Sequence, residues 1–368
     1  MTSVPRVAVS MGDPTGIGPE VTLAALLQRR RPRALRPILV GDHGVYEAAA
    51  ALLGRQTQFV EWVPSEPLPR RGVPLRVISR LAPSQRRPGH PTLAGGRAAH
   101  AAIVEAVRLV RSGLADALVT APVCKANLVA AGLPVGGHTE LLAELSGGAA
   151  VRMMMVGPRL RVVLVTTHLA LRSVPQALTE QLVHDTLVIT HRALRVQFGI
   201  ARPRIGVAGL NPHAGEAGVF GDEEGRLIAP AVRSARRQGI DAQGPVAADS
   251  LFPLASSGRF DAVVCMYHDQ GLAPFKLLHF ADGVNLTLGL PFVRTSPDHG
   301  TAHDIAGRGV ADPRSMSEAL RLAVALSRPK AVSESRRQHR PSRQMRPFSG
   351  QRRARGARRV RAAAAPLQ

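Results

Sequence analysis

Aromatic side chains and cysteines are both scarce in this chain of 368 residues. Aromatic residues make up 3% of the chain, with two Tyr and one Trp, which disfavours the stacking platforms that single-stranded nucleic acids need. The two cysteines, Cys124 and Cys265, cannot form a disulfide framework and do not form a CxxC pair for a metal or redox centre. We therefore expect a protein of the reducing cytoplasm.

Long apolar runs and the common nucleotide-binding motifs are absent as well. No apolar stretch reaches the roughly 18 residues of a membrane span. The first residues, MTSVPRVAVSMGDP, lack the basic start and apolar segment of a secretory signal. Neither GxGxxG nor a Walker A sequence occurs, so a dinucleotide site, if present, is not of the common Rossmann type. We expect no membrane partner.

The positive charge is concentrated at the end of the chain. The net charge is +22, yet the last 41 residues, from Arg328, hold 13 Lys and Arg against one acid, Glu334. Residues 329–368 are Arg-rich and lack apolar periodicity, so they cannot bury enough surface to fold alone. We predict a catalytic unit of residues 1–328 and a basic, disordered tail of residues 329–368. Nucleic-acid binding through this tail is a remote alternative, and it would be steeply salt-dependent.

Apolar runs alternate with helical patterns along the remaining sequence. RVAVSMG leads into a Gly/Pro turn and the helical pattern PEVTLAALLQ, and PILVGD precedes VYEAAAALL. The segment GGRAAHAAIVEAVRLVRSG has helical periodicity, and ADALVTAPV follows it as a strand. Short, continuous apolar runs of this kind are typical of strands buried on both faces. The alternation predicts an α/β fold with a largely parallel sheet.

Three of the apolar runs end on a polar cap that carries a histidine. They read LRVVLVTTH, RIGVAGLNPH and DAVVCMYHDQ, with His168, His213 and His268. In parallel sheets, ligands bind outside the carboxyl ends of the strands. Three imidazoles at that edge can share one divalent metal and leave a coordination position open for substrate. Asp269 follows His268 and could orient its imidazole or act as a ligand itself. Each histidine could instead be an ordinary hydrogen-bonded residue, because sequence spacing does not prove that they meet.

Two further segments have features of ligand-binding loops. In MGDPTGIGPE, the glycines at positions 12, 16 and 18 allow a sharp turn and a close approach of the backbone to a ligand, although such a turn is often only a turn. His138 and Thr139 precede an amphipathic helix in GGHTELLAEL. Free N–H groups at a helix start form an anion site, and the alternative is a plain N-cap.

Residues 275–309 place three polar side chains around a strand-like core: Lys276, Asn285 and Arg294. Arginine offers a planar fork for carboxylate or phosphate, and lysine offers a point charge. Each cation could alternatively be a solvated surface residue. The segment is thus a candidate for binding an anionic substrate.

Taken in order, the motifs resemble one family over residues 6–327. MGDPTGIGPE, GGHTELLAEL, TTHLALRSVP, LNPHAGEAGVFGDEE, MYHDQGLAPFK and GVNLTLGLPFVRTSPDHGTAHDIAGRG are closely similar to the 4-hydroxythreonine-4-phosphate dehydrogenases of pyridoxal phosphate biosynthesis. GDPTGIGPE and DHGTAHDIAGRG also resemble loops of isocitrate and isopropylmalate dehydrogenases. The resemblance implies two discontinuous α/β/α sub-domains with the active-site cleft between them, in a homodimer whose subunits share each active site.

The resemblance also implies roles for individual residues. It makes the three strand-end histidines, His168, His213 and His268, ligands of zinc, cobalt or magnesium, and imidazole softness favours zinc or cobalt. Substrate would be bound by His138, Thr139, Lys276, Asn285 and Arg294. Lys276 and Asp269 would be catalytic, and NAD or NADP would be contacted by Gly12, Asp13, His299 and Gly300.

The activity that the resemblance implies is oxidation of 4-phosphooxy-L-threonine followed by decarboxylation to 3-amino-2-oxopropyl phosphate. Relatives with the same motifs leave two alternatives open: a dehydrogenase of threonate or erythronate 4-phosphate, and one of a cis-dihydrodiol. The sequence departs from the family pattern at Cys124, where Asn or Ser commonly precedes the lysine, so we expect a hydrogen bond near Lys125 to be missing. The basic tail also lies beyond the usual end of the family.

Overall fold

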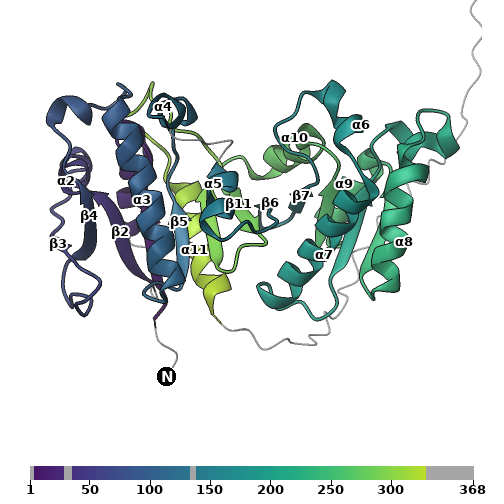
Figure 1. The fold of residues 1–368 in the computed structure, drawn as a ribbon, viewed down its shortest axis with the longest axis horizontal. Helices are drawn as coiled ribbons and strands as arrows, with labels where there is room; N and C mark the ends of the chain where they lie inside the picture. The colour runs from purple at the N-terminus through teal and green to yellow at the C-terminus, as the bar shows by residue number, and fades with distance from the viewer. Residues whose placement is uncertain (1–3, 29–34, 133–137, 329–368) are drawn as a thin grey trace, which may run out of the picture. The chain divides into compact units, whose positions relative to one another are not determined.

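The computed structural model describes residues 4–28, 35–132 and 138–328, and the predicted tail of residues 329–368 lies outside them. One twelve-stranded sheet runs through the described ranges (Figure 1). Its strands are β1 (Arg6–Ser10), β2 (Arg36–Asp42), β3 (Phe59–Glu61), β4 (Val73–Ser79), β5 (Ala117–Thr120), β6 (Arg152–Val156), β7 (Arg161–Leu164), β8 (Arg204–Ala208), β9 (Asp241–Val246), β10 (Ala262–Cys265), β11 (Val284–Leu288) and β12 (Val293–Pro297).

Helices alternate with these strands, as the sequence predicts. They are α1 (Gly18–Leu27), α2 (His43–Leu52), α3 (Leu93–Arg111), α4 (Lys125–Ala130), α5 (His138–Leu145), α6 (Val174–Ala177), α7 (Glu180–Val196), α8 (Ala229–Arg237), α9 (Ala248–Ser256), α10 (His268–His279) and α11 (Arg314–Ser327). Shorter turns are η1 (Pro83–Gln85), η2 (Leu171–Ser173), η3 (Pro212–Gly218) and η4 (Glu224–Ile228). No helix of the described ranges is long and apolar enough to cross a bilayer.

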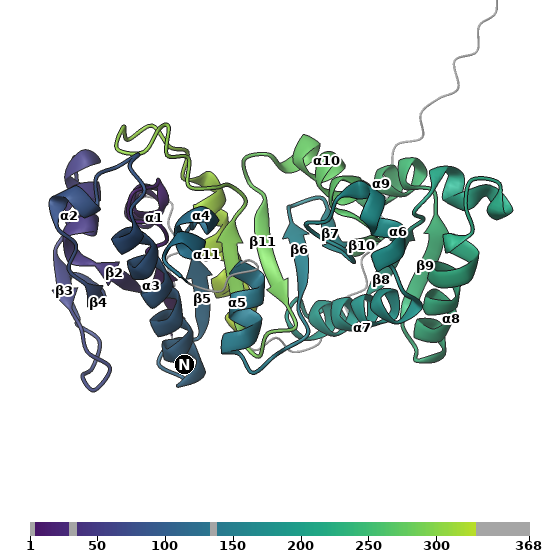
Figure 2. The ribbon, with the colours of Figure 1, turned by 45° about the horizontal axis from the view of Figure 1, so that its top comes forward.

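The strand order is β3-β4-β2-β1-β5-β12-β11-β6-β7-β10-β8-β9. All pairings are parallel except three in the middle, β12–β11, β11–β6 and β6–β7. Figure 2 shows β11 and β6 side by side between the two parallel halves. The α/β class and the largely parallel sheet are therefore confirmed.

Two of the three antiparallel pairings follow from short connections. β6 and β7 are joined by residues 157–160, and β11 and β12 by residues 289–292. Such loops are too short for a crossover, so they turn the chain back on itself. Gly289 has φ +91°, and a Cβ there would lie 2.1 Å from the Ala150 carbonyl oxygen, so only glycine fits this turn.

The core sits on both faces of the strands. Val7, Ala8 and Val9 of β1 and every residue of β5 are fully buried. Because these strands are buried on both faces, their sequences are unbroken apolar runs and do not alternate between apolar and polar residues. The carboxyl ends of the two parallel halves thereby become the places where polar side chains can gather.

Glu105 joins α3 to the neighbouring strand β4. Its side chain is 14% exposed, and it accepts hydrogen bonds from Arg76 at 2.7 Å and from Arg108 at 2.7 and 2.8 Å. The bond from Arg108 is the main cause that lowers the pKa of the Glu105 carboxyl, and Arg76 adds to it against the opposing effect of burial. A lowered carboxyl pKa stabilises the fold above the ordinary pKa, and this stabilisation is lost as the pH falls through the lowered value.

Replacing Glu105 with glutamine should therefore lower the free energy of unfolding by about 1 kcal/mol at neutral pH. The gap should close as the pH falls below the ordinary value of 4.5. Chemical unfolding of both proteins at neutral and acid pH measures it. Glu61→Gln is the control, because the ion pair of Glu61 with Arg80 is solvent-exposed and contributes little. Equal stability of Glu105→Gln and the parent at neutral pH would contradict the assignment.

Candidate functional site

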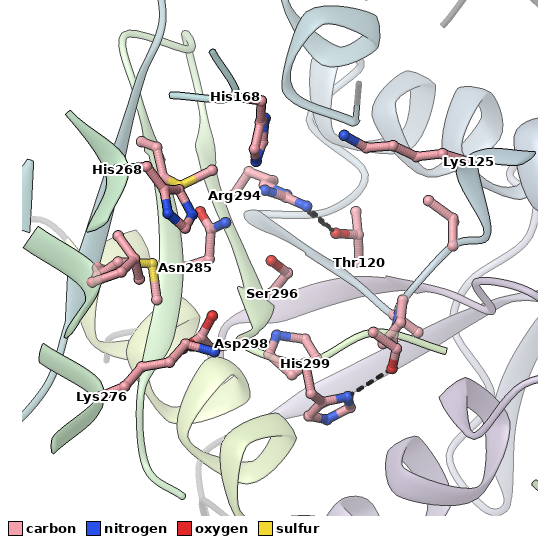
Figure 3. A pocket seen from close by; sticks show the side chains of 18 of the residues that line it. Thr120, Lys125, His168, His268, Lys276, Asn285, Arg294, Ser296, Asp298 and His299 are labelled. Carbon is pink, nitrogen blue, oxygen red and sulfur yellow. Dashed lines mark hydrogen bonds and ion pairs between the residues drawn. The ribbon is translucent and has the colours of Figure 1, made fainter. Parts of the chain in front are cut away.

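A cavity of about 410 Å³ lies where the central strands end. Figure 3 shows the side chains that line it. They come from β5, β6, β11, β12, α4, α5 and α10 and from the loops after β5, β7 and β12. The polar members are Thr120, Lys125, Glu140, His168, His268, Lys276, Asn285, Arg294, Ser296, Asp298 and His299. The sequence-predicted residues Lys276, Asn285 and Arg294 are thus brought together with two of the strand-end histidines.

Arg294 forms the fixed cationic wall of this cavity. It is 2% exposed, and its Nη2 and Nε donate to the Thr120 hydroxyl at 2.6 and 3.1 Å. Its Nη1 donates to the Thr287 hydroxyl at 3.0 Å. Burial lowers the pKa of the Arg294 guanidinium, because the charged form loses hydration. An oriented, desolvated guanidinium is suited to a carboxylate or phosphate oxygen of a ligand.

Lys276 and Asp298 form an ion pair at the cavity. The Lys276 ammonium lies 3.4 Å from Asp298 Oδ2, and the side chains are 41% and 15% exposed. Burial raises the pKa of the Asp298 carboxyl, and the charge of Lys276 opposes that shift. Asp298 and Thr120 were missed by sequence reasoning. Thr120 is the last residue of β5, and Asp298 comes just after β12. The search for polar residues at the carboxyl ends of strands, which identified the histidines, could therefore have identified both.

His168 and His268 meet at the cavity. Their ring centroids are 5.7 Å apart. Burial lowers the pKa of His168, Lys125 and His268 act in the same direction, and Glu140 opposes them. A neutral imidazole is the form that binds a metal.

Asp269 acts through His268 in this arrangement. Its Oδ1 lies 2.7 Å from His268 Nδ1, while its own side chain is 86% exposed and does not line the cavity. A carboxylate that accepts from Nδ1–H fixes the ring and leaves Nε2 available as a ligand. The structure therefore places the Asp269 carboxylate against the His268 ring and outside the cavity lining, and its predicted catalytic role stays a prediction.

His213 does not join the other two histidines. It lies on η3, is exposed, and its ring packs 6.1 Å from that of Phe220. It is not among the residues that line the cavity. Across the residues that the structure describes, no group of three or more His, Cys, Asp or Glu side chains is placed to hold a metal ion. One chain therefore brings together two of the three predicted ligands, and the complete set stays a prediction.

His138 and Thr139 can be placed only by their backbone. They begin α5, whose next residue, Glu140, lines the cavity. The side chains of His138 and Thr139 lie outside the described part of the structure. Their predicted contact with substrate stays a prediction.

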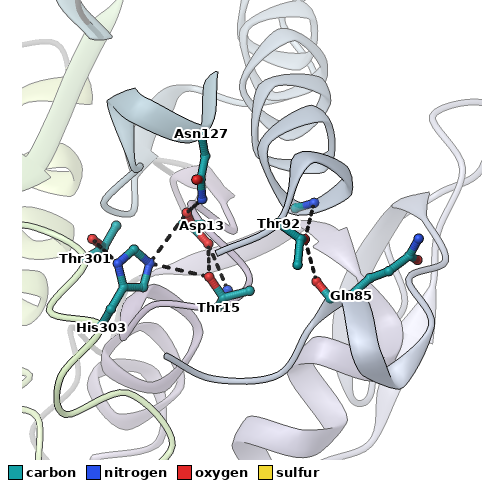
Figure 4. Close-up of polar contacts among 8 residues, drawn as sticks. Asp13, Thr15, Gln85, Thr92, Asn127, Thr301 and His303 are labelled. Carbon is teal, nitrogen blue, oxygen red and sulfur yellow. Dashed lines mark hydrogen bonds and ion pairs between the residues drawn. The ribbon is translucent and has the colours of Figure 1, made fainter. Parts of the chain in front are cut away.

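The two loops predicted to contact the cofactor are joined beside the cavity (Figure 4). Asp13 is 1% exposed. Its carboxylate accepts hydrogen bonds from the Thr15 backbone amide at 2.9 Å, the Thr15 hydroxyl at 2.7 Å and the Asn127 side-chain amide at 3.0 Å. His303 Nε2 lies 3.7 Å from its Oδ2. Asp13 therefore holds the first loop against α4 and against the loop after β12.

Gly12, His299 and Gly300 stand in the same region. Gly12 has φ +73°, and a Cβ there would lie 2.4 Å from the Pro122 carbonyl oxygen, so the close approach needs glycine. His299 and Gly300 line the cavity directly. The predicted contacts of Gly12, Asp13, His299 and Gly300 with a nicotinamide cofactor stay predictions.

Cys124 stands at the position where the sequence departs from the family pattern. It is the N-cap of α4, and its side chain makes no capping hydrogen bond. The expectation of a missing hydrogen bond beside Lys125 agrees with this. Lys125 itself lines the cavity, so the departure leaves a cation in place.

Comparison with known proteins gives one consistent result. The family model described as "Pyridoxal phosphate biosynthetic protein PdxA" matches residues 33–323. A 4-hydroxythreonine-4-phosphate dehydrogenase of Geobacter metallireducens is 52% identical over 332 residues, which are 89% of this chain and 96% of the relative. One of Desulfosudis oleivorans is 48% identical over 330 residues, covering 88% and 96% of the two chains.

Solved structures agree with the sequence relatives. A crystal structure of a 4-hydroxythreonine-4-phosphate dehydrogenase from Burkholderia phymatum has 42% identity and a TM-score of 0.77, covering 88% of this chain and 99% of that one. A terephthalate 1,2-cis-dihydrodiol dehydrogenase from Burkholderia xenovorans LB400 has 31% identity and a TM-score of 0.62, covering 87% and 98%. The two relatives have similar structures, but their names give different substrates.

Proposed function

Because the chain belongs to the PdxA family of pyridoxal phosphate biosynthetic proteins, we propose that it is a 4-hydroxythreonine-4-phosphate dehydrogenase. The family assignment rests on a match over most of the chain and on identities near one half. The observation in the structure that supports it is the cavity where Arg294 and Lys276 face His168 and His268. Two cations for an anionic substrate then stand beside two metal-binding imidazoles.

The reaction is an oxidation followed by loss of carbon dioxide. The substrate, 4-phosphooxy-L-threonine, gives up a hydride from the carbon that bears its hydroxyl, and the hydroxyl loses its proton. The resulting β-keto acid loses carbon dioxide and takes up a proton, which leaves 3-amino-2-oxopropyl phosphate. A bound nicotinamide cofactor would supply the hydride acceptor. Arg294 and Lys276 neutralise the phosphate and carboxylate of the substrate and thereby fix its orientation.

Dehydrogenases of this family depend on a metal as well as on a nicotinamide cofactor. His168 and His268 would hold such an ion, which would supply Lewis acidity to the hydroxyl that is oxidised. The pair of imidazoles fits such an ion, since His168 and His268 come from neighbouring strand ends and Asp269 fixes one ring. Imidazole donors favour zinc or cobalt over magnesium. His299 and Gly300, with Gly12 and Asp13 behind them, are the proposed contacts of NAD or NADP.

The substrate is tested by initial rates of nicotinamide reduction on a panel. The panel contains 4-phosphooxy-L-threonine, threonate and erythronate 4-phosphates and a cis-dihydrodiol, each with NAD and with NADP. We expect the highest kcat/KM with 4-phosphooxy-L-threonine, and one carbon dioxide released for each reduced cofactor formed. A higher kcat/KM on a sugar acid or a dihydrodiol would replace the proposed substrate.

We also propose a homodimer in which His213 of the partner subunit completes the ligand set. Three observations support it. His213 lies outside the cavity of its own chain, on an exposed turn. Val219 and Phe220 beside it are 73% and 49% exposed, and Leu277 and Phe280 of α10, the helix that begins at His268, are 86% and 81% exposed. Each of these two segments exposes a pair of apolar side chains close together in the chain, and this supports a partner-covered surface there.

Complementation tests the shared site. His168→Ala and His213→Ala dimers should each be inactive, because each lacks one ligand at both sites. Unfolding the two together and refolding them should restore about a quarter of the parental activity, since about half of the dimers are then mixed and each has one complete site of two. No recovery in a mixture that contains mixed dimers would show that one chain supplies all ligands of its own site.

We further propose that the two parallel halves of the sheet are the two sub-domains of the catalytic unit of residues 1–328. The cavity draws on both, since β5 and β12 belong to one half and α10 follows β10 of the other. We assign the basic tail of residues 329–368 no catalytic role. Truncation after Arg328 should leave kcat/KM unchanged, and a loss of activity in the folded truncated protein would assign the tail a role.

A further inference from the structure

The turn that carries His213 has a rare backbone conformation. Five successive residues, from His213 to Ala217, have positive φ values of 52°, 54°, 79°, 43° and 56°. Only one of them, Gly215, is a glycine. For L-residues the left-handed conformation is disfavoured, and it occurs as single residues rather than as a whole turn. Such a turn persists only when its surroundings hold it, and strain of this kind is concentrated at functional sites.

The group that holds the turn is the carboxylate of Glu224. This residue opens η4 and is 5% exposed. Its Oε1 accepts from the backbone amides of Leu210 and Asn211, both at 2.7 Å, and its Oε2 accepts from the Asn211 side chain at 3.0 Å. The three donors belong to the two residues at the end of the segment that leads into the turn.

The backbone of the turn also packs directly on this carboxylate. A Cβ at Gly209 would lie 3.0 Å from Glu224 Oε1, and a Cβ at Gly215 would lie 2.6 Å from Oε2. The segment therefore contacts the same carboxylate before His213 and after it. Because Glu224 is buried and His213 is exposed, the turn is anchored on one side and presents its imidazole on the other.

We propose that Glu224 is a positioning residue for the metal centre, which it serves by fixing the turn that presents His213. The inference rests on the proposed role of His213 as a ligand. The Glu224 carboxylate touches neither substrate nor metal, and it acts by keeping a strained turn from relaxing. Groups that orient a metal ligand without binding the metal themselves typically contribute tenfold to hundredfold to metal affinity.

The test measures Co²⁺ affinity of the metal-free, full-length protein by titration and by competition with a coloured chelator. Glu224→Ala should weaken Co²⁺ binding about a hundredfold, and Glu224→Gln, whose carbonyl oxygen can still accept from the two backbone amides, about tenfold or less. The visible absorption of bound Co²⁺ should change in Glu224→Ala toward that of His213→Ala. Asp222→Asn is the matched control, because Asp222 is exposed and its side chain pairs with Arg226.

A second variant perturbs the contact between Glu224 and the turn by a change in the turn itself. Gly215→Ala keeps the carboxylate but places a methyl group against Glu224 Oε2, and it should weaken Co²⁺ binding in a protein that still folds but melts at a lower temperature, because Gly215 has φ +79°. If His213→Ala binds Co²⁺ as the parent does, the ligand assignment itself is wrong. If His213→Ala loses affinity while folded Glu224→Ala and Gly215→Ala keep it, Glu224 has a structural role only and the inference is overturned.

Discussion

Replacing His168 with alanine should lower kcat about a thousandfold and release the bound metal. His168 lies 5.7 Å from His268 between ring centroids, and both rings line the cavity. A metal that stabilises the developing charge contributes about 4 kcal/mol to catalysis, which corresponds to about three orders of magnitude in rate. Elemental analysis of the purified variant measures the metal, and initial rates of nicotinamide reduction measure turnover.

The control for this prediction is His184→Ala. His184 lies on α7, where its Nε2 is 3.0 Å from the Gln238 side chain, and it is not among the residues that line the cavity. Metal content and kcat should stay at the parental values. A His168→Ala variant that keeps both its metal and its turnover would remove His168 from the ligand set.

Replacing Arg294 with methionine should lower kcat/KM by about two orders of magnitude. The side chain keeps a similar length but loses the buried charge that the Thr120 and Thr287 hydroxyls orient. Loss of one partner from a buried charged pair costs about 3 kcal/mol, and that is about a hundredfold in kcat/KM. Arg294→Lys restores the charge without the planar fork, so it should recover only part of the loss.

Steady-state kinetics on 4-phosphooxy-L-threonine distinguish binding from chemistry at Arg294. We expect most of the effect in KM if the guanidinium binds the phosphate, because the phosphate does not change in the reaction. Arg226→Lys serves as the control, since Arg226 is exposed and pairs only with Asp222 among the ion pairs of the described chain. A folded Arg294→Met variant with parental kcat/KM would exclude Arg294 from substrate binding.

Strand–helix alternation was enough to predict the class of this fold but not its centre. The runs before Gly12, Gly41 and Pro122 are buried on both faces, so their composition alone indicates parallel strands. The antiparallel pairings of β6 with β7 and of β11 with β12 depend on the short loops after Val156 and Leu288. Both loops contain a glycine and a proline, which indicate a turn but not whether a strand or a helix follows it. The register follows from tertiary packing.

The expectation that side chains at the carboxyl ends of parallel strands gather at one edge located part of the site, and it did so for a physical reason. β10 pairs with β7 on one side and with β8 on the other, so the segments that follow these strands leave the sheet at one edge. His168 and His268 stay at that edge and meet. His213 does not: it lies in a left-handed turn that follows Pro212, and it is not among the residues that line the cavity. No local pattern in LNPHAGEAG predicts that conformation, since four of the five residues avoid it in most proteins.

The most direct test is a single assay with and without a chelator. Purified protein, NAD or NADP and 4-phosphooxy-L-threonine should give reduced cofactor and carbon dioxide in equal amounts. Activity should stop when a chelator removes the metal and return when Zn²⁺ or Co²⁺ is added back. Sustained turnover in metal-free protein, or no turnover with metal restored, would contradict a metal-dependent dehydrogenase built around His168 and His268.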